Sequence, residues 1–271
     1  MVKKFKKISF IFICVVLIVT CVVLVGCRDN IQQNKRRRIN SVNHRGYLDA
    51  PENTLSAFRL SHEIGFDMVE CDVQFTADNQ PVLLHDSTVD RTSNGQGKIS
   101  ELTLEQARQL DFGSWKSEQY AGERIPTFQE FVDLCVQLQL HPYVEIKGAT
   151  ATQTQMLVDI VHDVGLVVTW ISFDREVLDV ISRISNARIG LLVNLLTHDC
   201  LEYLVSLNHG DVFVDCNYLT ISQISIDLCK KYNVPLEVWT LNNQDIVANL
   251  DPYISGVTSD SINAQDVFNN L

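Results

Sequence analysis

The segment VECDVQF, residues 69–75, alternates apolar and polar side chains and carries two carboxylates two positions apart. Alternate side chains of an extended strand lie on the same face, so Glu70 and Asp72 share one face opposite an apolar one. Two like charges on a buried face require protonation, cationic partners or a bound metal ion. The pair therefore indicates either an ordinary solvated strand face or an acidic site that does chemistry.

A second strand-like segment, HPYVEIKG at 141–148, places Glu145 and Lys147 on one face. If this strand lies beside the first in a parallel sheet, Glu145 converges with Glu70 and Asp72. Three carboxylates form an all-oxygen ligand set, which favours one divalent cation, Mg²⁺ or Ca²⁺, over zinc or copper. A structural ion pair between Glu145 and Lys147 is the alternative.

Two histidines stand directly after apolar runs. His44 and Arg45 end the run INSVNHR, and His85 follows PVLL and precedes Asp86. Each histidine alone would more often be structural than catalytic. Two histidines, an arginine, a lysine and three acids at one edge suggest phosphate-ester chemistry, because the cations neutralise phosphate oxygens and the histidines move protons.

The elements that must position these residues alternate regularly from residue 40 onward. Short apolar runs are separated by helix-like stretches, and Pro51 is predicted to open the first helix. This alternation predicts an α/β fold, a (β/α)8 TIM barrel whose strand ends form one polar mouth. Residues 86–125, rich in Gly, Ser, Thr and Asp, form an insertion after the second strand. An open doubly wound sheet is the alternative, but no G-x-G-x-x-G follows the first strand. The expected strands are 39–45, 67–75, 141–147, 166–173, 187–193, 211–215, 235–241 and 253–259.

Residues 1–26 form a basic segment followed by an apolar run, and LVGC at 24–27 resembles a bacterial lipobox. On that interpretation, the run is a signal peptide and Cys27 is the lipid-modified first residue of the mature lipoprotein. The alternative is an uncleaved signal anchor, because the run is long enough to span a bilayer. Both interpretations place a linker at 27–39 and a catalytic domain at 40–271, tethered to the cell membrane and facing outside.

Charge and cysteine usage exclude other classes. The first 38 residues carry nine Lys and Arg and one acidic residue, so the rest of the chain carries 13 basic and 32 acidic residues. A domain this acidic is a poor candidate for binding nucleic acid. The five cysteines after Cys27 lack any C-x-x-C spacing, so we expect buried thiols rather than a disulfide framework or a zinc site.

Taken together, these motifs resemble the glycerophosphodiester phosphodiesterase family from about residue 40 to the C-terminus. The insertion also resembles that of the family in DRTSNGQGKISELTLEQARQLDFGSW. The matching residues are His44-Arg45-Gly46 with Pro51-Glu52-Asn53-Thr54, Glu70-x-Asp72, His85-Asp86, Glu145-Ile146-Lys147, Trp239-Thr240 and Thr258-Ser259-Asp260.

The resemblance implies a role for each matched side chain and a reaction. It implies hydrolysis of a small-molecule glycerophosphodiester to sn-glycerol 3-phosphate and an alcohol. A phospholipase D-like enzyme acting on lysophospholipids or other membrane lipids is the alternative activity. A non-catalytic phosphate-binding lipoprotein would be expected to lack at least one key residue, but no key residue is missing from this sequence. The implied roles are metal ligands for Glu70, Asp72 and Glu145, acid and base for His44 and His85, phosphate contacts for Arg45 and Lys147, support of the metal or His44 for Glu52, and a wall beside the glycerol for Trp239.

Overall fold

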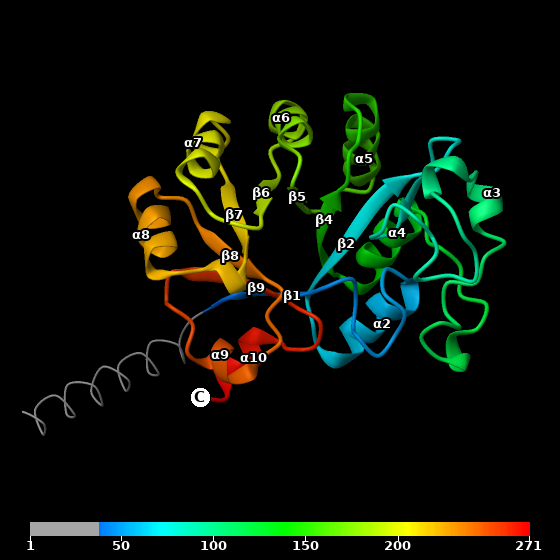
Figure 1. Ribbon diagram of the computed structural model, residues 1–271, viewed down its shortest axis with the longest axis horizontal. Helices are drawn as coiled ribbons and strands as arrows, with labels where there is room; N and C mark the ends of the chain where they lie inside the picture. Colours follow the sequence, from blue (N-terminus) through cyan, green and yellow to red (C-terminus); the bar gives the residue numbers. More distant parts are fainter. Residues whose placement is uncertain (1–37) are drawn as a thin grey trace, which may run out of the picture.

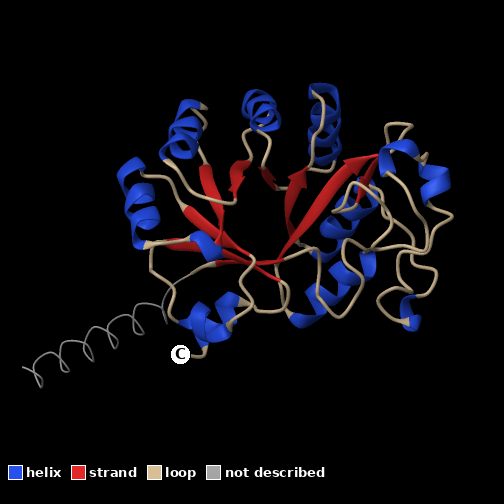
Figure 2. Cartoon of the chain, in the orientation of Figure 1, coloured by secondary structure: helices blue, strands red, loops and turns tan. Residues whose placement is uncertain are grey.

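Eight parallel strands close into a barrel in the computed structural model, which describes residues 38–271 (Figure 1). The strands follow one another in the order β1-β9-β8-β7-β6-β5-β4-β2, and β1 also pairs with β2. Helices surround this barrel on the outside (Figure 2). The predicted (β/α)8 barrel is therefore confirmed. The predicted leader at 1–26, the predicted lipidation site Cys27 and most of the predicted linker lie outside the described residues.

The barrel strands and their flanking helices alternate along the chain as expected. The strands are β1 Asn40–Asn43, β2 Met68–Phe75, β4 His141–Ile146, β5 Thr169–Ser172, β6 Arg188–Val193, β7 Val212–Asn217, β8 Leu236–Trp239 and β9 Ile254–Ser259. The main helices are α2 Leu55–Ile64, α4 Phe128–Leu138, α5 Ala151–Asp163, α6 Arg175–Ile184, α7 His198–Ser206, α8 Gln223–Tyr232, α9 Gln244–Ala248 and α10 Ala264–Asn269. No helix within 38–271 combines the length and apolar character that a bilayer crossing needs.

The first helix begins later than predicted. Thr54 is extended and its hydroxyl accepts a hydrogen bond from the amide of Ala57, so Thr54 is the N-cap of α2. The same hydroxyl donates to the carbonyl of Pro51 at 2.7 Å. The prediction that Pro51 opens the helix is therefore wrong, because the PENT segment forms a separate turn in front of the capping threonine.

Alternation along the strands divides the apolar side chains between two cores. Val69, Cys71 and Val73 of β2 belong to the large apolar cluster between the strands and the surrounding helices, whereas Tyr143 and Phe213 belong to a smaller cluster inside the barrel. The five cysteines among the described residues are all buried free thiols, as expected.

Polar side chains close the barrel below this inner cluster. The guanidinium of Arg188 donates to Glu237 Oε1 at 2.7 Å and to the hydroxyl of Tyr143 at 3.0 Å. Glu237 fits only because Gly256 faces it: a Cβ at that position would lie 2.4 Å from the carboxyl carbon. This end of the barrel, called the floor below, is thus closed by ion pairs and hydrogen bonds. The catalytic cavity described below lies on the opposite side of the inner cluster.

The segment between β2 and β4 contains an extra strand. β3, Pro81–Leu83, pairs antiparallel with the far end of β2, and the amide of Leu84 then donates to the carbonyl of Asp72 at 3.0 Å. This return carries His85 back to the mouth of the barrel. The rest of the segment holds η1 Ile99–Glu101, α3 Leu104–Ala107 and η2 Glu118–Tyr120, and packs around its own small core.

Candidate active site

Three buried carboxylates meet at the mouth of the barrel. Glu70 and Asp72 lie on β2, and the register places Asp72 opposite Glu145 on β4. Glu70, Asp72 and Glu145 each offer one oxygen, and these oxygens lie within 4.8 Å of one another. Hard oxygen donors at this spacing fit a hard divalent cation such as Mg²⁺ or Ca²⁺.

Two cations lie against this acidic cluster. Lys147 Nζ is 2.7 Å from Glu145 Oε1 and 3.0 Å from Asp72 Oδ1. Arg45 approaches from β1: its amide donates to Glu70 Oε2 at 3.0 Å and its Nε lies 3.2 Å from Asp72 Oδ2. These contacts balance part of the negative charge.

The same contacts set how the carboxyls ionise. Burial and the neighbouring charge of Asp72 raise the pKa of Glu70 well above its usual range and raise the pKa of Glu145 to about 7. Burial also disfavours the charge on Asp72, but Lys147 and Arg45 outweigh it and lower the pKa of that carboxyl. Asp72 is therefore the acid of the cluster whose ionised form is most favoured, whereas burial favours the protonated forms of Glu70 and Glu145 until a cation binds.

The turn after β1 is built by two residues in the left-handed region. Arg45 has φ 55° and Gly46 has φ 83°. A Cβ on Gly46 would lie 2.5 Å from the Cβ of Ala57, so only glycine allows this close approach to α2. Asn53, also at positive φ, donates to Asp72 Oδ2 at 2.8 Å and accepts from the Asp72 amide at 3.1 Å, which fixes that carboxylate.

Each predicted catalytic histidine has a carboxylate partner. Nδ1 of His44 lies 2.7 Å from Asp260 Oδ1, at the end of β9, and Nδ1 of His85 lies 2.7 Å from Asp86 Oδ1. Asn242 donates to the second oxygen of Asp260. A hydrogen bond at Nδ1 leaves Nε2 of each ring as the nitrogen that can exchange a proton with substrate.

Arg91, from the segment after β3, joins one histidine pair to Glu52. Its Nε donates to Asp86 Oδ2 at 2.7 Å, and its Nη1 and Nη2 donate to Glu52 at 2.6 and 2.8 Å. Glu52 Oε1 also accepts from Arg45 Nη1 at 3.1 Å. Glu52 therefore contacts the two arginines rather than the acidic cluster or His44.

A cavity of about 120 Å³ opens between these groups. Of the predicted site residues, His44, Arg45, Glu70, His85, Glu145 and Trp239 line it, whereas Asp72, Lys147 and Glu52 are next to it without forming its lining. Ile171, Phe173 and Leu192 form an apolar side with Trp239, whose ring meets that of Phe173 edge-on at 5.7 Å. The indole nitrogen of Trp239 donates to the carbonyl of Asp215 at 3.0 Å.

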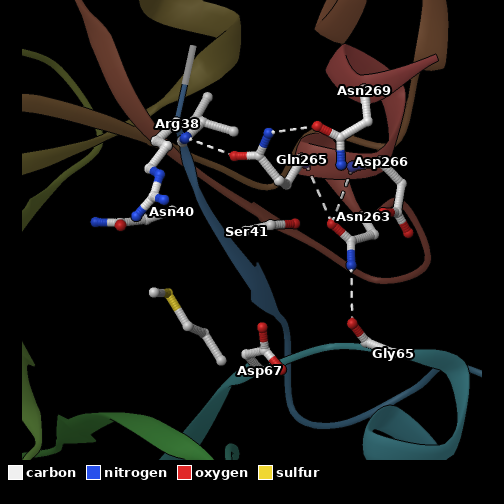
Figure 3. A pocket seen from close by; sticks show the side chains of 11 residues that line it. Arg38, Asn40, Ser41, Gly65, Asp67, Asn263, Gln265, Asp266 and Asn269 are labelled. Carbon is white, nitrogen blue, oxygen red and sulfur yellow. Dashed lines mark hydrogen bonds between the residues drawn. The ribbon is translucent and has the colours of Figure 1, made fainter. Parts of the chain in front are cut away.

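A larger hollow, about 770 Å³, lies at the other end of the barrel and has a different character (Figure 3). It lies beside the start of β1 and α10, where Asn263 donates to the carbonyl of Gly65 at 3.1 Å and Gln265 accepts from the amide of Ile39 at 3.0 Å. Neither catalytic histidine nor the acidic cluster faces it. The chemistry belongs to the smaller cavity.

Sequence reasoning assigned no role to four residues that shape this site. Asp260, Asp86 and Asn53 stand within the recognised motifs, and Arg91 follows His85 by six positions. For Asp86 and Asn53 the available signal was their position next to His85 and Glu52, whereas no neighbouring residue pointed to Asp260 or Arg91. Asp215 was missed as well, although it shares the inward face of its strand with Phe213.

A barrel with buried acids, two carboxylate-paired histidines and two cations at its mouth has the features of a phosphate-ester hydrolase. The Glycerophosphoryl diester phosphodiesterase family matches this chain over residues 44–264. The chain belongs to that family and is a phosphoric diester hydrolase.

Individual relatives agree with the family assignment. A glycerophosphodiester phosphodiesterase of Caldanaerobacter subterraneus subsp. tengcongensis is 32% identical over 225 residues, covering 80% of this chain and 92% of the relative. One from Bacillus subtilis is 26% identical over 264 residues, covering 86% of each. An Oleispira antarctica phosphodiesterase, solved in complex with the product sn-glycerol-3-phosphate, superposes with a TM-score of 0.77 at 26% identity, covering 84% of this chain and 94% of that one.

Proposed function

We propose that the protein hydrolyses glycerophosphodiesters to sn-glycerol 3-phosphate and an alcohol in a reaction that depends on one divalent cation. The observation that carries this proposal is the convergence of Glu70, Asp72 and Glu145 within 4.8 Å, beside a cavity that Glu70, Glu145, His44 and His85 line. The three carboxylates would hold Mg²⁺ or Ca²⁺. When bound, such an ion polarises a phosphoryl oxygen and offsets its negative charge.

Arg45 and Lys147 hold the phosphate of the substrate. Burial opposes the charge on each side chain, but Asp72 and the other neighbouring acids outweigh it and raise both pKa values. Both side chains therefore stay cationic and can donate to phosphate oxygens. Glu52 orients Arg45 through the 3.1 Å hydrogen bond to Nη1.

The two histidines carry the proton transfers. One takes a proton from the nucleophile, which is water or the neighbouring substrate hydroxyl, and the other protonates the departing alkoxide. Asp260 and Asp86 hold Nδ1 of the two rings, so Nε2 remains for the reacting atoms. Trp239 and its apolar neighbours contact the carbon skeleton of the glycerol.

The test follows release of glycerol 3-phosphate from a panel of glycerophosphodiesters and lysophospholipids, before and after chelation. Activity should disappear with chelator and return with Mg²⁺ or Ca²⁺. Glu70→Gln, Asp72→Asn and Glu145→Gln should each lose at least about 100-fold in kcat/KM, while Asp133→Asn, an exposed acid on α4, should not. Full activity after exhaustive chelation removes the cation from the mechanism, and no glycerol 3-phosphate from any diester refutes the substrate class.

The N-terminal segment supports a location for this activity. We propose that Cys27 anchors the protein to the outer face of the cell membrane as a lipoprotein, with an uncleaved signal anchor as the alternative. The support is the LVGC motif and the position of Arg38, which lies at the end of the barrel opposite the catalytic mouth. Cys27→Ser should abolish acyl labelling and leave an unprocessed precursor, whereas Cys21→Ser should do neither. Wild-type protein that keeps residues 1–26 and takes no label supports the signal anchor.

A further inference from the structure

Asp215 is a buried acid with no assigned task. It lies on β7 and shares the inward face with Phe213, so its carboxyl points into the barrel and lines the catalytic cavity. Its side chain is 1% exposed, and among the described residues no donor reaches Oδ1. Buried carboxyl oxygens are nearly always hydrogen-bonded, because leaving one unpaired costs free energy. An unpaired one facing a cavity indicates a group shaped for a ligand.

The cations of the barrel are committed elsewhere. Arg188 donates to Glu237 and Tyr143 in the floor, and Lys147 pairs with Asp72 and Glu145. Arg45, which lines the same cavity, pairs with Glu52 and Asp72. Burial, reinforced by the charge of Glu237, raises the pKa of Asp215 well above its usual range. Burial therefore favours the protonated carboxyl, which can both donate a hydrogen bond to a hydroxyl and accept one from it.

Asp215 lies across the barrel from the acidic cluster. In the closed order of eight strands, β7 is four strands from β2 in either direction, so Asp215 faces the acidic cluster from the opposite wall. Between them the cavity is apolar on the side of Ile171, Leu192 and Trp239. The 3.0 Å bond from the Trp239 indole to the Asp215 carbonyl holds the ring beside the acid.

One end of the cavity therefore suits a phosphate and one side wall suits carbon, while the far wall offers the carboxyl of Asp215; Thr258 is a further polar side chain in the lining. A glycerol phosphate has this order of groups: a phosphate, a three-carbon chain and a terminal hydroxyl. We propose that Asp215 binds the terminal hydroxyl of the glycerol moiety, the one remote from the phosphate, and thereby selects deacylated diesters over lysophospholipids acylated at that hydroxyl. The inference rests on the proposed function and names the part of the substrate that the site reads.

The expected selectivity follows from the hydrogen bond. A site built to pair with a substrate hydroxyl rejects an analogue that lacks it, because the buried group is then left unpaired. An acyl ester at this position would remove the hydroxyl hydrogen and place a chain against the buried wall of β7.

The experiment compares two diesters with the full-length enzyme. Glycerophosphocholine is compared with the phosphocholine diester of 1,2-propanediol, which keeps the hydroxyl next to the phosphate and lacks only the terminal one. Wild type should prefer glycerophosphocholine by about 10- to 100-fold in kcat/KM. Asp215→Leu should lose this preference by slowing glycerophosphocholine alone, and Asp215→Asn, which can still donate and accept, should retain most of it.

Three further measurements separate a binding role from a structural one. Melting temperatures of Asp215→Leu and of Asp215→Ala, which removes the carboxyl without adding bulk, should equal or exceed that of wild type, because an unpaired buried acid is lost. Cys216→Ala, on the outward face of the same strand, should leave the substrate preference unchanged. Lysophosphatidylcholine should be hydrolysed poorly by wild type and relatively better by Asp215→Ala.

The outcomes are distinguishable. If Asp215→Leu and Asp215→Ala slow both diesters equally, or keep the preference for the terminal hydroxyl, the acid does not bind that hydroxyl and the inference is wrong. If wild type hydrolyses neither diester, the proposed function fails and this inference fails with it.

Discussion

The ammonium nitrogen of Lys147 lies 2.7 Å from Oε1 of Glu145, two residues earlier in the chain. The same nitrogen is 3.0 Å from Asp72 Oδ1, so one lysine neutralises acids from two neighbouring strands. In the proposed mechanism Glu70, Asp72 and Glu145 would hold a divalent cation, and Lys147 would donate to the phosphate. The lysine and the cation would thus both offset the charge of the same carboxylates.

The stability of the metal-free protein should depend on this lysine. Lys147→Met removes the cation paired with Glu145 and leaves Asp72 with Arg45 as its one cationic partner among the described residues, so the free energy of unfolding in chelator should fall by about 3 kcal/mol. Added Mg²⁺ or Ca²⁺ should recover much of that loss, because the cation replaces the missing charge. Denaturant titrations with and without cation measure both values, and Lys147→Arg is the charge-conserving control. An equal loss in both conditions would show that the lysine does not neutralise the cluster.

Arg91 should act through the residues it holds. Arg91→Met removes the donors to Asp86 and Glu52, so His85 and Arg45 lose their fixed positions and kcat should fall about tenfold while the fold persists. Arg91→Lys should recover little, because a lysine cannot bridge two carboxylates with a planar fork. Adding Arg91→Met to a His85→Ala enzyme should cost much less than in wild type. Independent, additive losses in that double variant would contradict a positioning role.

The arrangement of these residues marks what the sequence could and could not predict. Alternation placed Glu70 and Asp72 on one face, and the closed barrel then brought Glu145 beside them through the parallel register of β2 and β4. The direction of β3 was not foreseen, because a three-residue apolar run carries no information on whether its partner is parallel or antiparallel. The helix start was misplaced at Pro51, since the hydroxyl cap of Thr54 outweighs a proline that also suits a turn.

Long-range partners were harder to predict than the motif residues. Asp260 lies 216 positions from His44, and only the closure of β9 against β1 brings them together. Asp215 belongs to none of the motifs, and its importance appears only in the folded barrel, where no donor among the described residues reaches its Oδ1. Local spacing thus predicts which residues share a face, whereas pairing across the barrel depends on packing.

Protonation of His85 should occur at unusually low pH. Burial lowers the pKa of this imidazole below its ordinary value of 6.5, and the hydrogen bond to Asp86 offsets part of that effect. Because burial disfavours the charged ring, the neutral form should predominate at pH 6.5 in wild type. Asp86→Asn removes a group that favours the charged ring, so the pKa should fall further. Titration of the histidine ring signals by NMR, assigned with His85→Gln, measures both values. A His85 pKa above 6.5 in wild type, or a higher pKa in Asp86→Asn than in wild type, would contradict the stated effects of burial and of Asp86 on this ring.

The division of labour between the two histidines can be measured with a change of leaving group. His44 and His85 line one cavity and each has Nδ1 bonded to a carboxylate, so either ring can serve as acid or base. His44→Ala and His85→Ala should each lower kcat about 10²- to 10⁴-fold on glycerophosphodiesters, with small changes in substrate affinity.

The nitrophenolate of a nitrophenyl diester leaves without needing a proton. This substrate should therefore restore activity to the variant that lacks the acid and leave the variant that lacks the base inactive. His62→Ala, on the outer face of α2, is the control and should behave as wild type on both substrates. If both catalytic variants keep near wild-type kcat on natural diesters, the two-histidine mechanism is wrong. If the nitrophenyl substrate restores both or neither, the two rings do not divide the acid and base roles between them.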